Sequence, residues 1–257
     1  RSLQNLKLMT KFLKQFIFVS TILAILMIGG LAIYSATPGG KIKIAGGYQQ
    51  YGSGRPVAWW KMDEASWNGT AGEVKDSIGT NNGTSSGAIT TSTAVFGRAG
   101  SFDGVNDYIG VGDISSIEQT NVSFSFWMKV NSNTQDHDFI TKGEHAQGSP
   151  LVIWYDDVVG ATANKGANNT DTLSIIVSDN SLIQHWVAGT SGALNNTNWN
   201  YVTVVIDNTN NKILIYINGQ LNQSNTKSWN GIQNNASEIR FGADINNDSD
   251  SNLNGSL

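Results

Sequence analysis

The chain has 257 residues, contains no cysteine and carries a formal net charge of −4. Its length fits one sizeable domain plus an extra segment, at about 100 to 200 residues per domain. The absence of cysteine excludes a disulfide framework, a thiolate metal site and a thiol nucleophile. Residues 1–55 hold seven basic and no acidic residues, which leaves nine basic and twenty acidic residues, a net charge of −11, in the remainder. This acidic remainder argues against a nucleic-acid groove and is compatible with cation binding.

An uncharged apolar run, FIFVSTILAILMIGGLAIY, extends over residues 16–34. At about 1.5 Å per residue it nearly spans a hydrocarbon core of about 30 Å. We therefore expect one N-terminal transmembrane helix, with a basic cytoplasmic tail before it and the rest of the chain outside the cytoplasm, at the cell surface. A cleaved signal that yields a secreted protein is the alternative. The obvious cleavage point after Ala36 disfavours that alternative, because it places the bulky Tyr34 where a small residue is preferred.

Four regions are predicted along the chain. Residues 1–15 form the cytoplasmic tail and residues 16–34 the anchor. Residues 35–55, rich in Gly, Tyr and Gln without a sustained period, read as a linker, and residues 56–257 form the folded domain. Met9 is a plausible native start, which leaves residues 1–8 open to interpretation as upstream translation.

Short strand candidates separated by Gly, Asn, Ser and Thr clusters fill the folded domain, and no helical pattern lies between them. The segment 122–130, VSFSFWMKV, alternates cleanly, with apolar side chains on one face and Ser123, Ser125, Trp127 and Lys129 on the other. This pattern predicts an all-β fold, an antiparallel β-sandwich or jelly roll. The candidate strands are residues 57–62, 99–102, 108–111, 122–130, 139–142, 151–155, 172–177, 184–187 and 238–242, together with a hairpin over 199–219.

The hairpin over residues 199–219, WNYVTVVIDNTNNKILIYING, gives the strongest signal of packing. Isoleucines at every second position alternate with Leu214 and Tyr216, so both faces of the second strand are apolar and the hairpin is expected inside a two-layer stack. Residues 207–211, DNTNN, tolerate left-handed backbone and bond locally, which suits a hairpin loop better than a ligand site.

Several motifs resemble laminin-G-like domains of bacterial surface proteins, which belong to the concanavalin A-like lectin and glucanase superfamily. They are WWKMDE at 59–64, DSIGTNNGT at 76–84, FGRAGSFDGVNDYIGV at 96–111, FSFWMKV at 124–130, and WNYVTVVID followed by IYING. The resemblance covers residues 56–257 and implies a concanavalin A-like jelly roll. Such domains usually continue past the final Gly-Ser-Leu with an acidic residue and one more strand, so we expect the chain to be truncated within its last strand.

The loop at residues 244–252, DINNDSDSN, places oxygen side chains at alternate positions, as a hard cation such as calcium requires. It is not an EF-hand, because Ser249 and Gly255 replace the glycine and the glutamate of that motif. The resemblance implies a calcium site at one rim, at positions that match Asn196 and Asn252; a solvated polar loop is the alternative. The candidate metal ligands are Asn196, Asp244, Asp248, Asp250 and Asn252.

Four aromatic residues are candidates for stacking on a sugar: Trp127, Trp154, Tyr155 and Trp186. Trp127 is the most prominent, because it interrupts the polar face of its strand between Ser and Lys. The alternative is that these rings fill the space between the two sheets, as most tryptophans in a sandwich do.

Catalysis finds little support in the sequence. Glycosidases need two carboxylates that flank the scissile bond, typically E-x-D-x-E on this fold, and the five Glu residues never occur in such a pattern. We therefore expect a non-catalytic extracytoplasmic module that binds a glycan or a surface partner, with adhesion as its role and with possible calcium assistance. The alternatives are a divergent glycan-cleaving enzyme and a structural spacer of a larger surface protein.

Overall fold

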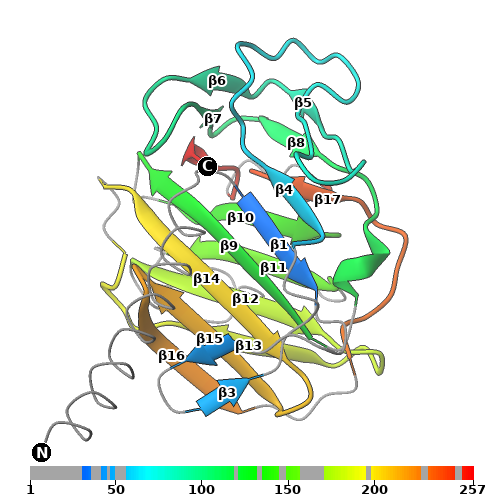
Figure 1. Ribbon diagram of the computed structural model, residues 1–257, viewed down its shortest axis with the longest axis vertical. Coiled ribbons are helices and arrows are strands. Elements are labelled where there is room, and N and C mark those ends of the chain that lie inside the picture. The colour runs from blue at the N-terminus through cyan, green and yellow to red at the C-terminus, as the bar shows by residue number, and fades with distance from the viewer. Residues whose placement is uncertain are drawn as a thin grey trace, which may run out of the picture.

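A computed structural model describes residues 31–35, 42–44, 47–49, 56–118, 121–131, 135–144, 149–156, 171–194, 198–226, 231–246 and 251–257, with the backbone alone described before residue 56. Two antiparallel sheets face each other in this part of the chain, and the only helix in it is the 3-10 turn η1 (Ser115–Ile117) (Figure 1). The predicted antiparallel β-sandwich is therefore confirmed.

The first sheet has nine strands, and its long central strands β9 and β14 run diagonally across the front of Figure 1. Its main path runs in the order β16 (Gln220–Thr226), β15 (Lys212–Ile217), β14 (Asn200–Asp207), β9 (Asn121–Val130), β18 (Asn254–Ser256), β7 (Ala99–Asp103) and β6 (Ile89–Thr91). Two further strands, β1 (Leu31–Ser35) and β4 (Ala58–Trp60), join this sheet beside β9.

The second sheet has seven strands and lies behind the first in Figure 1. Its strands run in the order β13 (Gln184–Ala188), β12 (Thr172–Ser178), β11 (Leu151–Asp156), β10 (His137–Lys142), β17 (Ile239–Phe241), β8 (Tyr108–Gly110) and β5 (Thr84–Ser86). The inward-facing residues of both sheets form one continuous apolar core.

The alternation predicted for residues 122–130 is confirmed. Val122, Phe124, Phe126, Met128 and Val130 are all buried in the core between the sheets, while the polar residues of β9 face outward. The pleat of the strand explains this, since successive side chains point to opposite faces.

The predicted hairpin is also confirmed, as β14 and β15. The isoleucines of β15 lie in the core, and Leu214 on the opposite face is 8% exposed. In the turn, Asp207 accepts hydrogen bonds from the backbone and side-chain nitrogens of Asn210 at 3.0 and 2.7 Å, and Asn211 has a φ of +55°. The turn residues therefore bond locally, as their sequence predicts.

The expected transmembrane helix through Tyr34 is not supported at its C-terminal end. Residues 31–34 belong to β1, which pairs antiparallel with β4 on one side and with β9 on the other. The backbone N–H and C=O groups of this segment form hydrogen bonds with both neighbouring strands, so they do not need the hydrogen bonds of a helix. The rest of the predicted helix, residues 16–30, lies outside the described residues.

No helix in the described part of the chain is long and apolar enough to cross a membrane. Within the predicted linker, β2 (Ile42–Ile44) and β3 (Gly47–Gln49) pair as a small separate hairpin.

The turn between β12 and β13 depends on the buried carboxylate of Asp179. Its Oδ1 accepts the N–H groups of Ser181 and Ile183 at 2.8 and 3.0 Å, and its Oδ2 lies 3.1 Å from His185 Nε2. Burial by itself raises the pKa of this carboxyl, but the hydrogen bonds from His185, Ile183 and Ser181 outweigh burial and hold the pKa below its usual value of 3.8.

This lowered pKa predicts a loss of stability in acid. The folded protein binds the proton less well than the unfolded chain, so the contribution of Asp179 is complete above the unfolded pKa of 3.8 and is lost as the pH falls through the folded value. The free energy of unfolding, measured in urea between about pH 5 and pH 2, should therefore fall more steeply in the wild type than in Asp179→Asn.

Asp107 provides a comparison of opposite sign. Burial and the nearby charge of Asp103 raise the pKa of its carboxyl, although a hydrogen bond from the backbone of Asp103 partly opposes them. Asp107→Asn should therefore gain stability relative to the wild type as the pH rises past 3.8, whereas Asp179→Asn should lose stability relative to the wild type as the pH rises toward 3.8 from below. If the stability of both variants relative to the wild type changed with pH in the same direction, the opposite pKa shifts of Asp107 and Asp179 would be contradicted.

Candidate functional site

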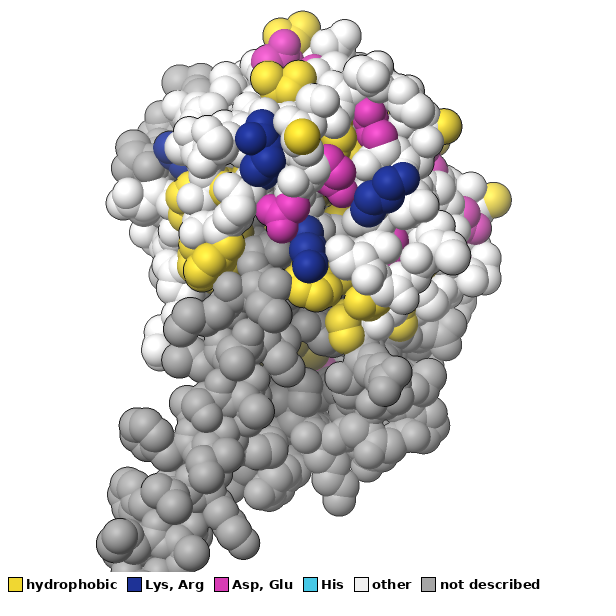
Figure 2. Space-filling model, turned by 45° about the horizontal axis from the view of Figure 1, so that its top comes forward, with side chains coloured by type: hydrophobic (Ala, Val, Ile, Leu, Met, Phe, Trp, Pro, Cys, Tyr) yellow, Lys and Arg dark blue, Asp and Glu magenta, His cyan; other side chains and the backbone are white. Residues whose placement is uncertain are grey.

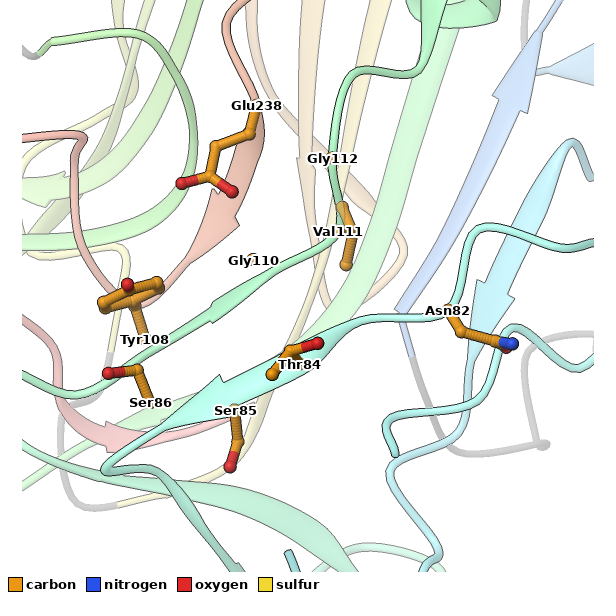
Figure 3. Close-up of a pocket in the computed structure, with 9 residues that line it drawn as sticks. All are labelled: Asn82, Thr84, Ser85, Ser86, Tyr108, Gly110, Val111, Gly112 and Glu238. Carbon is orange, nitrogen blue, oxygen red and sulfur yellow. The ribbon is translucent and has the colours of Figure 1, made fainter. Parts of the chain in front are cut away.

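A polar pocket of about 360 Å³ opens at the end of the second sheet where β5, β8 and β17 lie side by side (Figure 3). Hydroxyl, amide and carboxylate side chains line most of it, together with one tyrosine ring and two glycines. The lining residues are Asn82, Thr84, Ser85, Ser86, Tyr108, Gly110, Val111, Gly112 and Glu238.

The strand register explains the space in the middle of this pocket. Thr84 and Arg240 both pair with Gly110, so the three residues form a row across the outer face of the sheet. Gly110 contributes no side chain between its neighbours. A Cβ atom there would lie 2.8 Å from Glu238 Oε2 and 3.7 Å from Tyr108 Cε2, so the glycine leaves room for both side chains. Figure 3 shows the Glu238 carboxylate and the Tyr108 ring on the same side of β8, over Gly110.

Arg240 fixes the positions of two pocket side chains, Glu238 and Tyr108. Its Nε donates to Glu238 Oε1 at 2.6 Å, and its guanidinium carbon lies 4.1 Å from the centre of the Tyr108 ring. Its Nη1 donates to the carbonyl oxygens of Asp244 and Ile245 at 2.9 and 3.1 Å. Because Glu238 is one-third exposed, this ion pair adds little stability, but it fixes the direction of the carboxylate and of the ring.

The surface shown in Figure 2 carries a mixture of acidic and basic side chains, and hydrophobic side chains lie both singly and in small groups on it. Neither sign of charge forms a continuous area on that face. The described part of this face therefore has no continuous basic area of the kind that binds a polyanion.

The four aromatic residues predicted to stack on a sugar lie in three different places, two of them on outer faces of the sheets and one in the core. Trp127 is half-buried on the outer face of the first sheet, where its ring lies 5.2 Å from that of Tyr201 and its buried Nε1 has no hydrogen-bond partner among the described residues. Trp154 and Trp186 meet edge to face at 6.0 Å on the outer face of the second sheet. Trp154 is only 1% exposed. The structure therefore does not bring the four rings together.

Tyr155 is fully buried between the sheets. Its ring stacks on that of His137 at 5.8 Å, and its hydroxyl donates to the carboxylate of Asp171. This surrounds the tyrosine with protein and presents no open ring face to a ligand. His137 itself is the first residue of β10, and its Nδ1 is 3.1 Å from the carbonyl oxygen of Asn252.

Of the predicted metal ligands, Asp244 and Asn252 are described, whereas Asn196, Asp248 and Asp250 lie outside the described residues. Both described residues are buried. Asn252 Nδ2 donates to the carbonyl oxygen of Val105 at 2.6 Å, and Asn252 Oδ1 accepts no hydrogen bond from any described residue. In that part of the chain, no group of three or more His, Cys, Asp or Glu side chains is placed to hold a metal ion.

The sequence motifs do not predict the residues that form the pocket. Tyr108 and Gly110 stand in the motif at 96–111 and in the candidate strand 108–111, and Glu238 begins the candidate strand 238–242 without belonging to a carboxylate pair. A usable signal was the alternation Glu238-Ile239-Arg240, which puts opposite charges on the outer face around one buried residue.

Comparison with known families agrees with this architecture. The family model described as the concanavalin A-like lectin/glucanases superfamily matches residues 103–257, more than half of the chain. The chain belongs to this superfamily. The match includes β8 to β18 and therefore the pocket residues of β8 and β17, with β5 outside it. Comparison with curated protein sequences gave no match.

Several solved structures are similar in fold to this superfamily member. Domain 4 of AbnA, a GH43 extracellular arabinanase from Geobacillus stearothermophilus in complex with arabinotriose, is 20% identical, with a TM-score of 0.48, over 70% of this chain and 82% of that one. The CBM40 of a Ruminococcus gnavus IT-sialidase bound to α2,3-sialyllactose is 10% identical, with a TM-score of 0.40, over 52% of this chain and 71% of that one. The binding domain of Paraclostridial Mosquitocidal Protein 1 is 16% identical, with a TM-score of 0.49, over 74% of this chain and 45% of that one.

Proposed function

We propose that the domain is a non-catalytic module that binds a glycan in the pocket formed by β5, β8 and β17. The observation that carries this proposal is the arrangement over Gly110, where a carboxylate, a guanidinium group and a tyrosine ring are held together beside several hydroxyl groups. Pockets for small ligands typically combine a few convergent polar groups of this kind.

The chemistry of the lining selects for a ligand rich in hydroxyl groups. Glu238 only accepts hydrogen bonds, whereas the hydroxyls of Thr84, Ser86 and Tyr108 can donate as well as accept. A sugar hydroxyl also does both, so it can satisfy each of these groups. An apolar ligand would leave them without partners, at a cost of about 1–3 kcal/mol for each buried group. A phosphate would be repelled by the carboxylate.

The lining also favours binding over cleavage. Glycoside hydrolysis needs a pair of carboxyl groups about 5–9.5 Å apart on the two sides of the scissile bond. Among the described residues that line the pocket, Glu238 is the one carboxylate, and Arg240 binds it at 2.6 Å. A divergent glycan-cleaving enzyme remains the second candidate, since the superfamily also includes glucanases.

We further propose that calcium supports the rim through the loop at residues 244–252 together with Asn196. The buried Asn252 Oδ1, without a hydrogen-bond donor among the described residues, has the chemistry of a calcium ligand. This loop also connects with the pocket, because Arg240 bonds the carbonyl oxygens of Asp244 and Ile245. A cation bound by this loop would thus help to position Arg240.

The calcium proposal predicts a stabilisation by mass action. Calcium added to chelator-treated protein at about 100 times its dissociation constant should raise the free energy of unfolding by about 2.7 kcal/mol. The double variant Asp248→Ala/Asp250→Ala should lose this gain. Titration calorimetry that records no heat with calcium on the wild-type protein would contradict the proposal.

The role of the N-terminal region is also a proposal. We propose that residues 16–30 contribute to a membrane anchor that presents the domain outside the cytoplasm, where it would act in adhesion. A spacer role within a larger surface protein is the alternative. Deletion of residues 56–257 should abolish adhesion, and an inert sandwich of equal length should not restore it.

Binding of the wild-type protein to an array of neutral and acidic glycans tests the main proposal, with product analysis of each bound glycan to detect cleavage. We expect retention of at least one glycan class without cleavage. The variant Trp127→Ala tests whether the glycan binds instead on the outer face of the first sheet, and we expect it to retain the glycan as the wild type does. Loss of retention in Trp127→Ala would show that the binding site lies on the first sheet. Cleavage of a bound glycan would favour the enzyme alternative.

A further inference from the structure

A buried lysine lies between two carboxylates on the side of the second sheet that faces the core. Lys142 in β10 is fully buried, which is rare for lysine. Its Nζ lies 2.6 Å from Asp113 Oδ1, 3.2 Å from Glu118 Oε1 and 2.6 Å from the carbonyl oxygen of Ser237. Three oxygen atoms, two of them from carboxylates, therefore surround one amine in the protein interior.

The three side chains differ in their access to water. The side chains of Lys142 and Glu118 are 0% and 2% exposed, whereas that of Asp113 is 39% exposed. The neighbours of Lys142 on the adjacent strands are the core residues Leu151 and Ile239. The amine is thus enclosed by apolar side chains on its own sheet and is reached from outside only past Asp113.

The geometry points to an intramolecular amide bond between Lys142 Nζ and the side-chain carboxyl carbon of Asp113, with Glu118 as the group that transfers the proton. This covalent link is independent of the glycan pocket. The two reacting groups are in hydrogen-bond contact, which is the proximity that makes an intramolecular reaction fast.

The reaction balances without an added reagent. One proton moves from the lysine ammonium to the Asp113 carboxylate and gives a neutral amine and a carboxylic acid. The Nζ lone pair then attacks the carboxyl carbon, a carbon–oxygen bond breaks, and one molecule of water leaves. Glu118 accepts a proton from Nζ and delivers it to the departing hydroxyl.

The surroundings fit the product as well as the reactants. The amide nitrogen keeps one hydrogen, and the carbonyl oxygen of Ser237 at 2.6 Å is in place to accept it. The partial exposure of Asp113 provides a route by which the product water leaves. Since the chain has no cysteine, this bond would take the place of a disulfide and join the segment between β8 and β9 to β10, across 29 positions of sequence.

The test is the mass of the intact wild-type chain after denaturation. We expect a mass lower by one water molecule in all molecules that have folded, and a proteolytic digest in which the peptides that contain Asp113 and Lys142 remain joined. The full mass, with the two peptides separate, would overturn the proposal. A ring closure at Asp103-Gly104 would give the same loss of water, so a mass deficit that maps there also overturns it.

Variants separate the roles of the three residues. Asp113→Ala and Lys142→Met should show the full mass, whereas Lys212→Met, which changes an exposed lysine on β15, should keep the deficit. Glu118→Gln keeps the size of the side chain but removes the proton acceptor, and it should form the bond at least tenfold more slowly after refolding. An unchanged rate in Glu118→Gln would remove Glu118 from the mechanism. The wild-type mass decides the existence of the bond even where a variant fails to fold.

Discussion

Trp60→Ala is expected to lower the free energy of unfolding by about 3–5 kcal/mol, as replacement of a fully buried aromatic residue does. Trp60 is 0% exposed and lies in the shared core. Its ring meets that of Phe241 edge to face at 5.1 Å, and its Nε1 donates to the carbonyl oxygen of Asn81 at 2.7 Å. Because β4 belongs to the first sheet and Phe241 to the second, this one side chain connects the two layers.

The adjacent tryptophan gives a matched control. Trp59 is half-buried on the opposite face of β4, where Lys61 Nζ lies 4.7 Å from the centre of its ring. Trp59→Ala should therefore cost about 1 kcal/mol or less. Urea unfolding of both variants measures the difference, and equal losses would mean that Trp60 does not connect the sheets as described.

Gly110→Val is expected to weaken glycan binding more than about tenfold, a loss above about 1.4 kcal/mol, while the domain remains folded. The new side chain would occupy the middle of the pocket, where even a Cβ atom comes within 2.8 Å of Glu238 Oε2. That oxygen is the end of a flexible side chain, so Glu238 can move aside without disturbing the backbone. The substitution therefore removes both the space and the direction of the carboxylate.

Ala188→Val is the control for a branched side chain on the same sheet. Ala188 lies on the outer face of β13, the strand at the opposite edge from the pocket. This variant should bind the selected glycan as the wild type does, and both variants should unfold at similar urea concentrations. If Gly110→Val still bound with unchanged affinity, the ligand would not occupy this pocket.

Long strands with a clean period could be predicted from the sequence. β9 and the β14–β15 hairpin have apolar side chains at every second position, and all of these face the core. A pleated strand buries alternate residues whatever its partners are, so the period is a local property of the chain. The hairpin turn is local in the same sense, because Asp207 and Asn210 bond across three residues.

Short polar strands could not be predicted in this way. β18 lies in the middle of the first sheet, between β9 and β7, yet its sequence is Asn-Gly-Ser. A Cβ atom at Gly255 would come within 2.2 Å of the carbonyl oxygen of Lys129, so the strand depends on close backbone approach and not on apolar side chains. β5 and β16 were missed for a related reason, since both carry mainly polar residues.

The sequence by itself determined the fold class and the core residues of the long strands, because the alternation of apolar and polar residues along a strand can be recognised in consecutive positions of the chain. Only the tertiary structure decided where a ligand could bind. Thr84, Gly110 and Arg240 are far apart in the chain and meet because three strands pair in one register. The same holds for Lys142 and its two carboxylates, whose contacts depend on how the segment between β8 and β9 packs against β10.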